Sequence, residues 1–357
     1  MRLLTTTLLT TVSLIAFAAA SPATAGGYKV GKHTFGGKFS ITAGQNSNAA
    51  SAAAKAGKSF DDEDEDEDLE DLVEDNELDP QELAEDDSEE DDDDDNDGIP
   101  DFSEPGTPAQ VYRDSRVQYG AGLNHAYAFS DTFSWKSAVL AGVNRQMDRH
   151  ELNRINWAAN TGPEFKIKSW GVTINPSVTY AQLEKAHKNQ SESTIASLAT
   201  KWKVNKKLDL SARVNKEFRN NVAPRTTNTD VAALKLGAAY KLTAKDKVSF
   251  NWSPKIDRNE NALKSKDAWS ADIGYARKLP WDMTAGIGYK YSESEFINGI
   301  AVPLRKDKDH LYSTALSKNF KNGMFAAIGA AYKSKDANIA LKGNHDKSVF
   351  IQTGWKF

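Results

Sequence analysis

The sequence predicts an all-β fold, a transmembrane antiparallel β-barrel of fourteen strands with a disordered acidic insert. Three features predict it: an export signal at the N-terminus, long segments in which apolar and polar residues alternate, and connections between these segments that are alternately short and long. The 357-residue chain is long enough for one such domain. It has no cysteine, which excludes disulfides, thiolate metal sites and cysteine nucleophiles.

Residues 1–25 have the features of a secretory signal peptide. Arg2 supplies the positive charge, Leu8–Ala20 is a short apolar run, and Ala23–Ala25 is an A-x-A cleavage site, with Ala18–Ala20 as the alternative. The apolar run is too short and too rich in alanine and threonine for a good membrane-spanning helix. We therefore expect the chain to be exported and to cross a membrane, if it does so, with strands.

From residue 110 onward the hydrophobic pattern has a period of two, which is typical of strands. In Arg116–Phe129 one face is apolar and aromatic, whereas the other is small and polar, and the same alternation recurs in 232–242 and 283–291. Strands of soluble proteins average about five or six residues, and these segments are about twice as long. Their length and the export signal favour an apolar face that contacts outer-membrane lipid over one buried against a second sheet.

The connections between the predicted strands fall into two classes. Short turns are predicted at 130–132, 169–171, 205–207, 244–247, 280–282 and 321–323. Longer polar loops are predicted at 148–153, 188–193, 221–230, 259–266, 298–309 and 338–347. Outer-membrane barrels place their short turns in the periplasm and their long loops outside the cell, so the two classes also predict the orientation of the chain.

These connections account for thirteen strands, whereas single-chain bacterial barrels have an even number. The alternating segment 33–43 supplies the missing strand and places both termini in the periplasm. We therefore assign 26–45 to a first barrel strand, 46–107 to an acidic low-complexity loop outside the cell and 108–357 to the rest of the barrel. The alternative is that 26–107 forms a periplasmic tail.

The chain ends in an alternating strand that finishes with an aromatic residue. Val349, Ile351, Thr353, Trp355 and Phe357 are predicted to share its outward face. Outer-membrane barrels commonly end this way, and by that resemblance Phe357 would be presented to the barrel-insertion machinery. Outer-membrane lipid and this machinery are therefore expected partners in a Gram-negative bacterium.

The segment from Asp61 to Glu104 contains 28 Asp and Glu and neither Lys nor Arg. Without it the chain has 22 acidic residues against 45 Lys and Arg, so a basic body carries an acidic insert. The simplest interpretation is a solvated, self-repelling and disordered segment. A second hypothesis is that the segment folds over or into the basic barrel mouth as an electrostatic plug.

The end of this segment also matches the pattern of a calcium-binding loop. Alternate carboxylates on a turn that contains glycine can converge on one calcium ion, which prefers six to eight oxygen ligands. The candidate ligands are Asp93, Asp95, Asp97, Asp101 and Glu104. The stretch resembles thrombospondin type 3 calcium repeats more than an EF-hand, because the prolines that follow cannot begin the required exit helix. Calcium is the one cofactor that the sequence suggests, against plain disorder as the alternative.

Four stretches, 275–296, 303–320, 336–357 and 161–184, resemble the C-terminal barrel of the surface lipoprotein assembly modifier family in pattern and turn placement. Members of this family are fourteen-stranded outer-membrane barrels. The resemblance implies a role in delivering proteins or lipoproteins to the cell surface, with a surface protein or lipoprotein as client. Family members usually carry a periplasmic helical-repeat domain, and residues 26–107 show no such repeat.

The alternative function is a passive porin-like channel. Lys136, Lys166, Lys235 and Lys290 fall on predicted inward faces. A basic lumen would favour anions, unless these lysines pair with Asp and Glu across the wall. Conductance in planar bilayers separates a channel from a closed assembly barrel.

An outer-membrane hydrolase is the third class of function. The six histidines are His33, His125, His150, His187, His310 and His345. His125 lies next to Asn124, but no spacing of nucleophile and base can be identified across strands. We therefore expect no enzymatic activity, single out no catalytic residue, and expect no nucleic-acid partner.

Overall fold

A computed structural model provides the structure of the protein. Fifteen strands and two short 3-10 helices make up nearly all of what it describes. The described residues are 28–46, 114–147, 150, 153–185, 188–222, 227–297, 304–338 and 344–357. The proposed signal peptide and calcium ligands lie outside them, as do the acidic segment and His187. Among the described residues, no helix is long and apolar enough to cross a membrane.

The strands that form the wall are mostly fourteen residues long, with a longest strand of 17. In chain order the strands and 3-10 helices (η) are β1 Tyr28–Val30, β2 His33–Asn46, β3 Asp114–Ser130, β4 Phe133–Gln146, β5 Arg154–Ile167, β6 Val172–Lys185, β7 Lys188–Lys203, β8 Leu208–Asn221, β9 Thr227–Lys241, β10 Asp246–Asn259, η3 Ala262–Lys264, β11 Lys266–Leu279, η4 Pro280–Asp282, β12 Met283–Phe296, β13 Lys306–Asn319, β14 Met324–Ala337 and β15 Asn344–Lys356.

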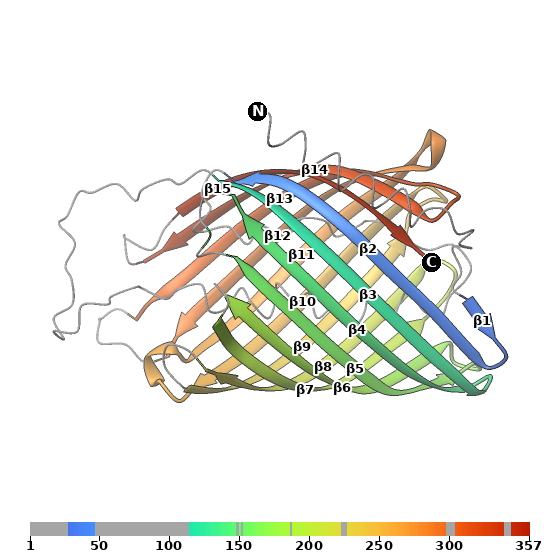
Figure 1. Ribbon diagram of the computed structural model, residues 1–357, viewed down its shortest axis with the longest axis horizontal. Helices are drawn as coiled ribbons and strands as arrows, with labels where there is room; N and C mark the ends of the chain where they lie inside the picture. Colours follow the sequence, from blue (N-terminus) through green and yellow to red (C-terminus); the bar gives the residue numbers. More distant parts are fainter. Residues whose placement is uncertain are drawn as a thin grey trace.

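The strands form one closed antiparallel barrel (Figure 1). Each strand from β2 to β15 pairs with its neighbours in the chain, and β15 pairs with β2 to close the sheet. β1 pairs with the first residues of β2 and forms a short hairpin with them. The fourteen-stranded transmembrane barrel predicted from the alternating pattern and the even strand number is therefore confirmed.

The C-terminal residue completes the seam at which the barrel closes. The backbone nitrogen of Phe357 donates to the carbonyl oxygen of Gly37 at 2.9 Å, and the nitrogen of Gly37 donates back to the carbonyl oxygen of Phe357 at 2.9 Å. The ring of Phe357 lies over the space where a side chain on Gly37 would stand. Gly37 is thus a close-approach glycine, needed because an aromatic ring from the opposite strand covers its backbone.

Replacing Gly37 with valine is expected to weaken this seam. The added side chain would collide with the Phe357 ring and would come within 3.0 Å of the carbonyl oxygen of Gly122, which is backbone and cannot easily move. We expect a lower yield of folded barrel, measured as the heat-modifiable fraction on semi-native gels. Gly120→Val is the matched control, because its new Cβ would meet only the flexible Ser40 hydroxyl. Equal folding yields for the two variants would contradict this role of Gly37.

The two ends of the barrel differ in their connections, as expected. One end carries the turns that follow β3, β5, β7, β9, β11 and β13, together with the C-terminus and β1 (Figure 1). By the general rule for outer-membrane barrels this end faces the periplasm, and the end with the longer connections faces outward. β2 ends and β3 begins at the outward end, so both points where residues 47–113 join the barrel lie there.

Several predicted loops at the outward end are too long. Residues 188–193 belong to β7, and 227–230, 306–309 and 344–347 likewise belong to strands. These segments are polar, and polarity in the sequence predicts a loop as readily as it predicts a strand outside the membrane. On the outer face, cross-strand ion pairs join two of these extensions to the neighbouring strands: Lys306 with Glu293 at 2.6 Å, and Asp230 with Lys216 at 3.3 Å. The strands therefore continue beyond the apolar band of the wall.

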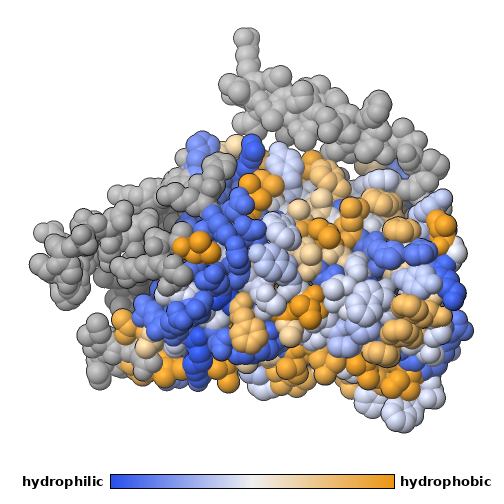
Figure 2. Space-filling view, turned by 60° about the horizontal axis from the view of Figure 1, so that its bottom comes forward, coloured by the Kyte–Doolittle hydropathy of each residue, from blue (hydrophilic) through white to orange (hydrophobic). Residues whose placement is uncertain are grey.

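The outer face is apolar over its middle, as the alternation predicted. Leu123, Ile287 and Ile351 expose 61%, 59% and 62% of their surface on this face. Figure 2 shows hydrophobic side chains over much of the visible wall, with hydrophilic ones concentrated toward one end. So many large exposed apolar side chains on a closed barrel require a lipid environment, and the protein is an outer-membrane β-barrel.

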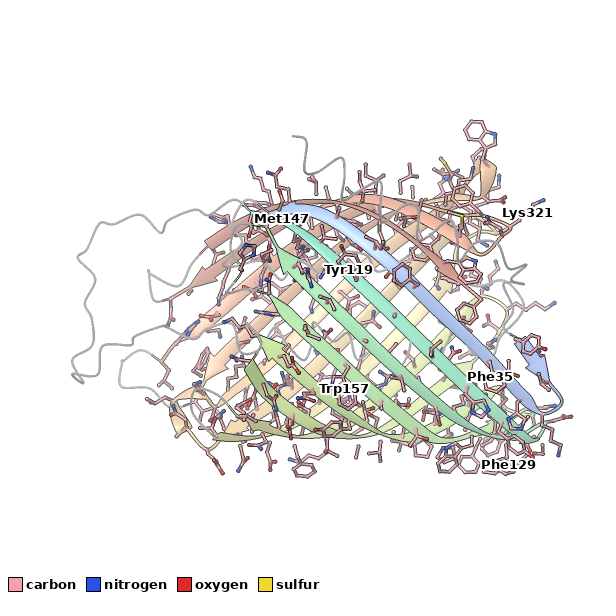
Figure 3. The ribbon with its side chains drawn as sticks, viewed as in Figure 1. Phe35, Tyr119, Phe129, Met147, Trp157 and Lys321 are labelled. Carbon is pink, nitrogen blue, oxygen red and sulfur yellow. The ribbon has the colours of Figure 1, made fainter. Side chains whose placement is uncertain are left out.

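Aromatic side chains mark the edges of this apolar band. Near the periplasmic turns, a chain of ring contacts crosses three strands, from Tyr127 to Phe129, Phe133 and Phe165, with centroids 4.7 to 5.1 Å apart. Phe129 and Phe35 lie at this end in Figure 3. Toward the outward end, Trp157 contacts Tyr180 and Trp269 contacts Tyr291. Two such belts are the expected signature of the two membrane interfaces.

Candidate functional site

Most of the buried polar side chains of the barrel lie on its inner face. Residues alternate between the faces in the observed register, so the lumen-facing set follows from the strand pairing. The lumen-facing cations are Lys38, Arg116, Lys136, Arg154, Lys166, Lys185, Lys201, Lys203, Arg213, Arg219, Lys235, Lys241, Lys247, Lys255, Lys266, Lys278, Lys290, Lys333, Lys335 and Lys356. The lumen-facing carboxylates are Asp114, Glu164, Asp209, Glu217, Asp257, Asp272, Asp307, Asp309 and Asp346. Cations therefore outnumber carboxylates on this surface.

The four lysines predicted to face inward all do so, and two of them share one carboxylate. The Nζ atom of Lys136 lies 2.6 Å from Glu164 Oε2, and both side chains are almost completely buried. Lys166 approaches the other oxygen of Glu164 at 3.6 Å. The charges of Lys136 and Lys166 are therefore compensated by a nearby carboxylate. For these two lysines, the alternative to a basic lumen holds. Glu164 was missed at the sequence level, because only the register of β4 and β5 places it beside Lys136.

Two further clusters lie in the outward half of the wall. On β8, Arg219 Nε donates to Glu217 Oε1 at 2.9 Å, and Ser193 on β7 donates to the same oxygen at 2.8 Å. At the start of β13, Arg305 makes a two-pronged contact with Asp307 at 2.7 and 3.1 Å, and Lys335 approaches the same carboxylate at 3.3 Å. These networks fix charged side chains against the wall.

Several amide oxygens on the inner wall are buried and have no hydrogen-bond partner among the described residues. They include those of Asn144, Gln146, Asn160 and Asn221. Buried polar atoms in native proteins are almost always hydrogen-bonded, to ordered water if not to protein. The lumen is therefore expected to contain water that reaches the wall.

Aromatic side chains on the inner wall lie flat against it over glycines. A side chain on Gly354 would collide with the ring of Phe325, and one on Gly329 with the ring of Phe350. In each case the ring and the glycine are direct cross-strand partners on β14 and β15. This arrangement, in which an aromatic ring covers a glycine of the neighbouring strand, keeps large side chains along the wall instead of across the lumen.

A known protein family matches most of this chain. The family described as surface lipoprotein assembly modifier matches residues 101–357, which cover every strand from β3 to β15. The chain belongs to the surface lipoprotein assembly modifier family. A search of curated proteins finds no match.

The solved structures that resemble this family member include other outer-membrane barrels. OmpT from Vibrio cholerae has 8% sequence identity and a TM-score of 0.47, with 92% of this chain and 99% of that chain covered. An anion-selective porin from Comamonas acidovorans has 8% identity and a TM-score of 0.45, covering 91% and 99%. The toluene transporter TodX from P. putida has 10% identity and a TM-score of 0.44, covering 95% and 93%. At this identity the similarity concerns the fold alone.

His125, whose position next to Asn124 was considered and not adopted as a hydrolase site, lies on the outer face of this assembly modifier barrel. His125 stacks on Phe35 with centroids 4.7 Å apart, and its Nε2 lies 3.0 Å from His33 Nδ1. Asn124 faces the lumen and lies over Gly36. His125 and Asn124 are thus on opposite sides of the wall, and the structure does not bring them together.

The described part of the chain contains no cluster of three or more His, Asp or Glu arranged to hold a metal ion. All five of the proposed calcium ligands, from Asp93 to Glu104, lie outside the described residues. The calcium site therefore stays a prediction from the sequence.

One outward loop of the assembly modifier barrel is tied to the neighbouring strand by a carboxylate. Glu260 accepts hydrogen bonds from the backbone nitrogen of Asn228 at 2.9 Å and from its side-chain amide at 2.8 Å. These bonds, the backbone bond first, lower the pKa of Glu260, because they stabilise the ionised form. The tie thus persists to lower pH than it would for an ordinary glutamate and is lost as the pH falls through the lowered pKa.

Proposed function

We propose that this outer-membrane barrel assists the delivery of proteins or lipoproteins to the cell surface. The observation that carries the proposal is the family match, which extends over thirteen of the fourteen barrel strands. The polar, hydrated inner wall is consistent with this role, because a client or part of it would meet water and charged groups instead of an apolar core.

The test is the surface exposure of proteins in the host bacterium. Deleting the gene is expected to reduce the protease accessibility of a set of surface proteins on intact cells, while their total amounts stay unchanged. Quantitative mass spectrometry of shaved peptides measures the first quantity, and whole-cell proteomics measures the second. Expression of the full chain from a plasmid should restore accessibility. An unchanged surface proteome in the deletion strain would contradict the proposal.

A passive channel that favours anions is the second candidate. The excess of cations over carboxylates on the inner wall favours it, because such a lumen lowers the energy of an anion more than that of a cation. In planar bilayers with a salt gradient, a steady conductance with an anion-selective reversal potential would support the channel. A barrel that stays closed in the same assay, together with the surface defect described above, would support delivery.

A further inference from the structure

Lysines on the periplasmic rim are concentrated in two adjacent turns. The turn between β7 and β8 carries Lys206 and Lys207, and the turn between β9 and β10 carries Lys245, with all of these side chains exposed. The two turns lie side by side, because the backbone nitrogen of Lys241, at the end of β9, donates to the carbonyl oxygen of Lys207 at 2.8 Å. The three ammonium groups are therefore presented from one short arc of the rim.

Side-chain hydrogen bonds fix the backbone of both turns. Asn205 Oδ1 accepts from the backbone nitrogens of Lys207 at 2.8 Å and of Leu208 at 3.0 Å. In the second turn, Thr243 Oγ1 accepts from the backbone nitrogen of Lys245 at 3.0 Å. The lysine backbones are therefore held in place before a ligand arrives, which lowers the entropy cost of binding.

The carboxylate beside these turns has a cation of its own. Among the described residues of the two turns and of the outer-face strand ends next to them, this carboxylate is Asp246. It accepts a hydrogen bond from the Tyr275 hydroxyl at 2.6 Å and lies 3.3 Å from Arg277 Nη1. Asp209, at the start of β8, faces the lumen. Since Arg277 balances Asp246, the lysines give the outer rim of this sector a net positive charge.

The outer wall next to these lysines, on the membrane side, is apolar. Trp202 near the end of β7, Tyr240 near the end of β9 and Leu242 in the second turn expose 45%, 43% and 49% of their surface. Leu210 on β8 stands opposite Trp202 in the register. Tryptophan and tyrosine prefer the boundary between hydrocarbon and headgroups. The acyl chains of the periplasmic leaflet therefore begin at these rings, and the lysines of the turns lie at the height of the phosphates.

Elsewhere at this end of the described barrel, the lysines of the turns are single. Lys32, Lys168 and Lys321 each belong to a different turn. Lys168 lies 3.6 Å from Asp131, and Lys32 donates to the carbonyl oxygen of Phe129 at 3.4 Å. Evenly spaced charges suit general contact with a membrane. A cluster of lysines above an apolar wall suits one ligand with a charged head and an apolar tail.

We infer that the sector from β7 to β10 binds an anionic phospholipid of the periplasmic leaflet. Its phosphate lies among Lys206, Lys207 and Lys245, and its acyl chains lie along Trp202 and Leu210. Each lysine at a membrane surface contributes about fivefold to the affinity for anionic lipid. A free anion makes no use of the apolar wall, so the combination of charge and wall favours a lipid. The inference is independent of whether the barrel delivers proteins or conducts ions.

Native mass spectrometry of the folded full chain in a non-ionic detergent, titrated with phosphatidylglycerol, tests this inference. The test variant removes the clustered lysines: Lys206→Gln, Lys207→Gln and Lys245→Gln. The control variant removes the same charge from three separate turns of the same rim: Lys32→Gln, Lys168→Gln and Lys321→Gln. Phosphatidylcholine with the same acyl chains serves as the lipid without net charge. Heat modifiability on semi-native gels checks that both variants are folded.

The unchanged chain should bind phosphatidylglycerol at least about tenfold more tightly than phosphatidylcholine. The test variant should lose about tenfold in affinity for phosphatidylglycerol, and the control less than about threefold. Equal losses in both variants, or equal affinities for the two lipids, would overturn the inference. So would displacement of the lipid by inorganic phosphate at equal concentration, which indicates a site for a free anion. A dimer that the test variant abolishes would assign the sector to a contact between copies and would also overturn it.

Tryptophan fluorescence in vesicles locates the bound lipid. The vesicles consist of phosphatidylcholine with a minor fraction of phosphatidylglycerol, and either lipid carries bromine near its carbonyl groups to quench nearby indoles. Trp202→Phe should remove most of the extra quenching that brominated phosphatidylglycerol causes over brominated phosphatidylcholine. Trp135→Phe is the matched control, because Trp135 lies on the outer face of β4 near the periplasmic turns and is 42% exposed. Equal effects of the two substitutions would place the lipid elsewhere and contradict the assignment.

Discussion

Ile351→Arg is expected to destabilise the folded barrel by about 2–4 kcal/mol, the usual effect of a cation on the lipid face near the middle of the membrane. Ile351 lies in the apolar band of β15, between Trp355 at the periplasmic side and His345 at the outward side, and its side chain is 62% exposed. Urea unfolding in lipid vesicles measures the change, with the fluorescence of the eight tryptophans as signal.

Gln352→Arg is the matched control for this substitution. Gln352 is the next residue on the same strand, so it sits at almost the same depth but faces the lumen. An arginine there meets water and polar groups, and we expect a change within about 0.5 kcal/mol. Equal destabilisation by the two variants would mean that lipid does not contact the outer face, and the assignment of a membrane barrel would fail with it.

Glu164→Gln is expected to destabilise the barrel by about 3 kcal/mol, because it removes the carboxylate partner of a buried ammonium group. Lys136 and Glu164 have side-chain exposures of only 4% and 8%. Glu164 also contacts Lys166. Without its carboxylate, the positive charges of Lys136 and Lys166 repel each other with no negative charge between them. The same urea titration measures this effect.

The double variant Lys136→Met with Glu164→Gln separates the ion pair from simple loss of packing. Removing both charges should recover most of the stability lost in Glu164→Gln, because no uncompensated charge is then buried. Asp131→Asn is the surface control. It breaks the contact of Asp131 with Lys168, in which both side chains are largely exposed, and we expect no measurable change. A double variant as unstable as Glu164→Gln would contradict the electrostatic explanation.

The alternation of residue types was sufficient to predict the barrel wall. The outward set that includes Val117, Leu123 and Ile287 faces outward in the structure, and the final strand places Ile351 and Phe357 as expected. The reason is physical: a two-residue period leaves a strand only two possible orientations, and lipid accepts one of them. Strand ends were harder to predict. Charged residues such as Lys306 and Lys308 occur equally well in a loop and on a strand that extends beyond the bilayer. Their polarity therefore does not show where the strand begins.

The arrangement of the inner wall was only partly predictable. Alternation placed Lys136, Lys166, Lys235 and Lys290 on the inside, but their partners depend on register between strands. A shift of two residues keeps every side chain on its own face and changes every pair across the wall. The predicted turn at 244–247 includes Lys247, whereas in the structure Lys247 lies on β10 opposite Lys241 on β9, so this pairing follows only from the observed register.

The position of β2 affects the order in which the barrel can assemble. From β3 to β15, most paired strands follow one another in the chain and are joined by short connections. This part of the sheet can therefore form one hairpin at a time. β2 is separated from β3 by residues 47–113, and it must also meet β15 from the far end of the chain. Closing long chain segments costs more entropy and slows folding. We expect β2 to be the last strand to join the sheet and close the barrel. Pulsed proteolysis during refolding should find β2 protected only after β13 and β14.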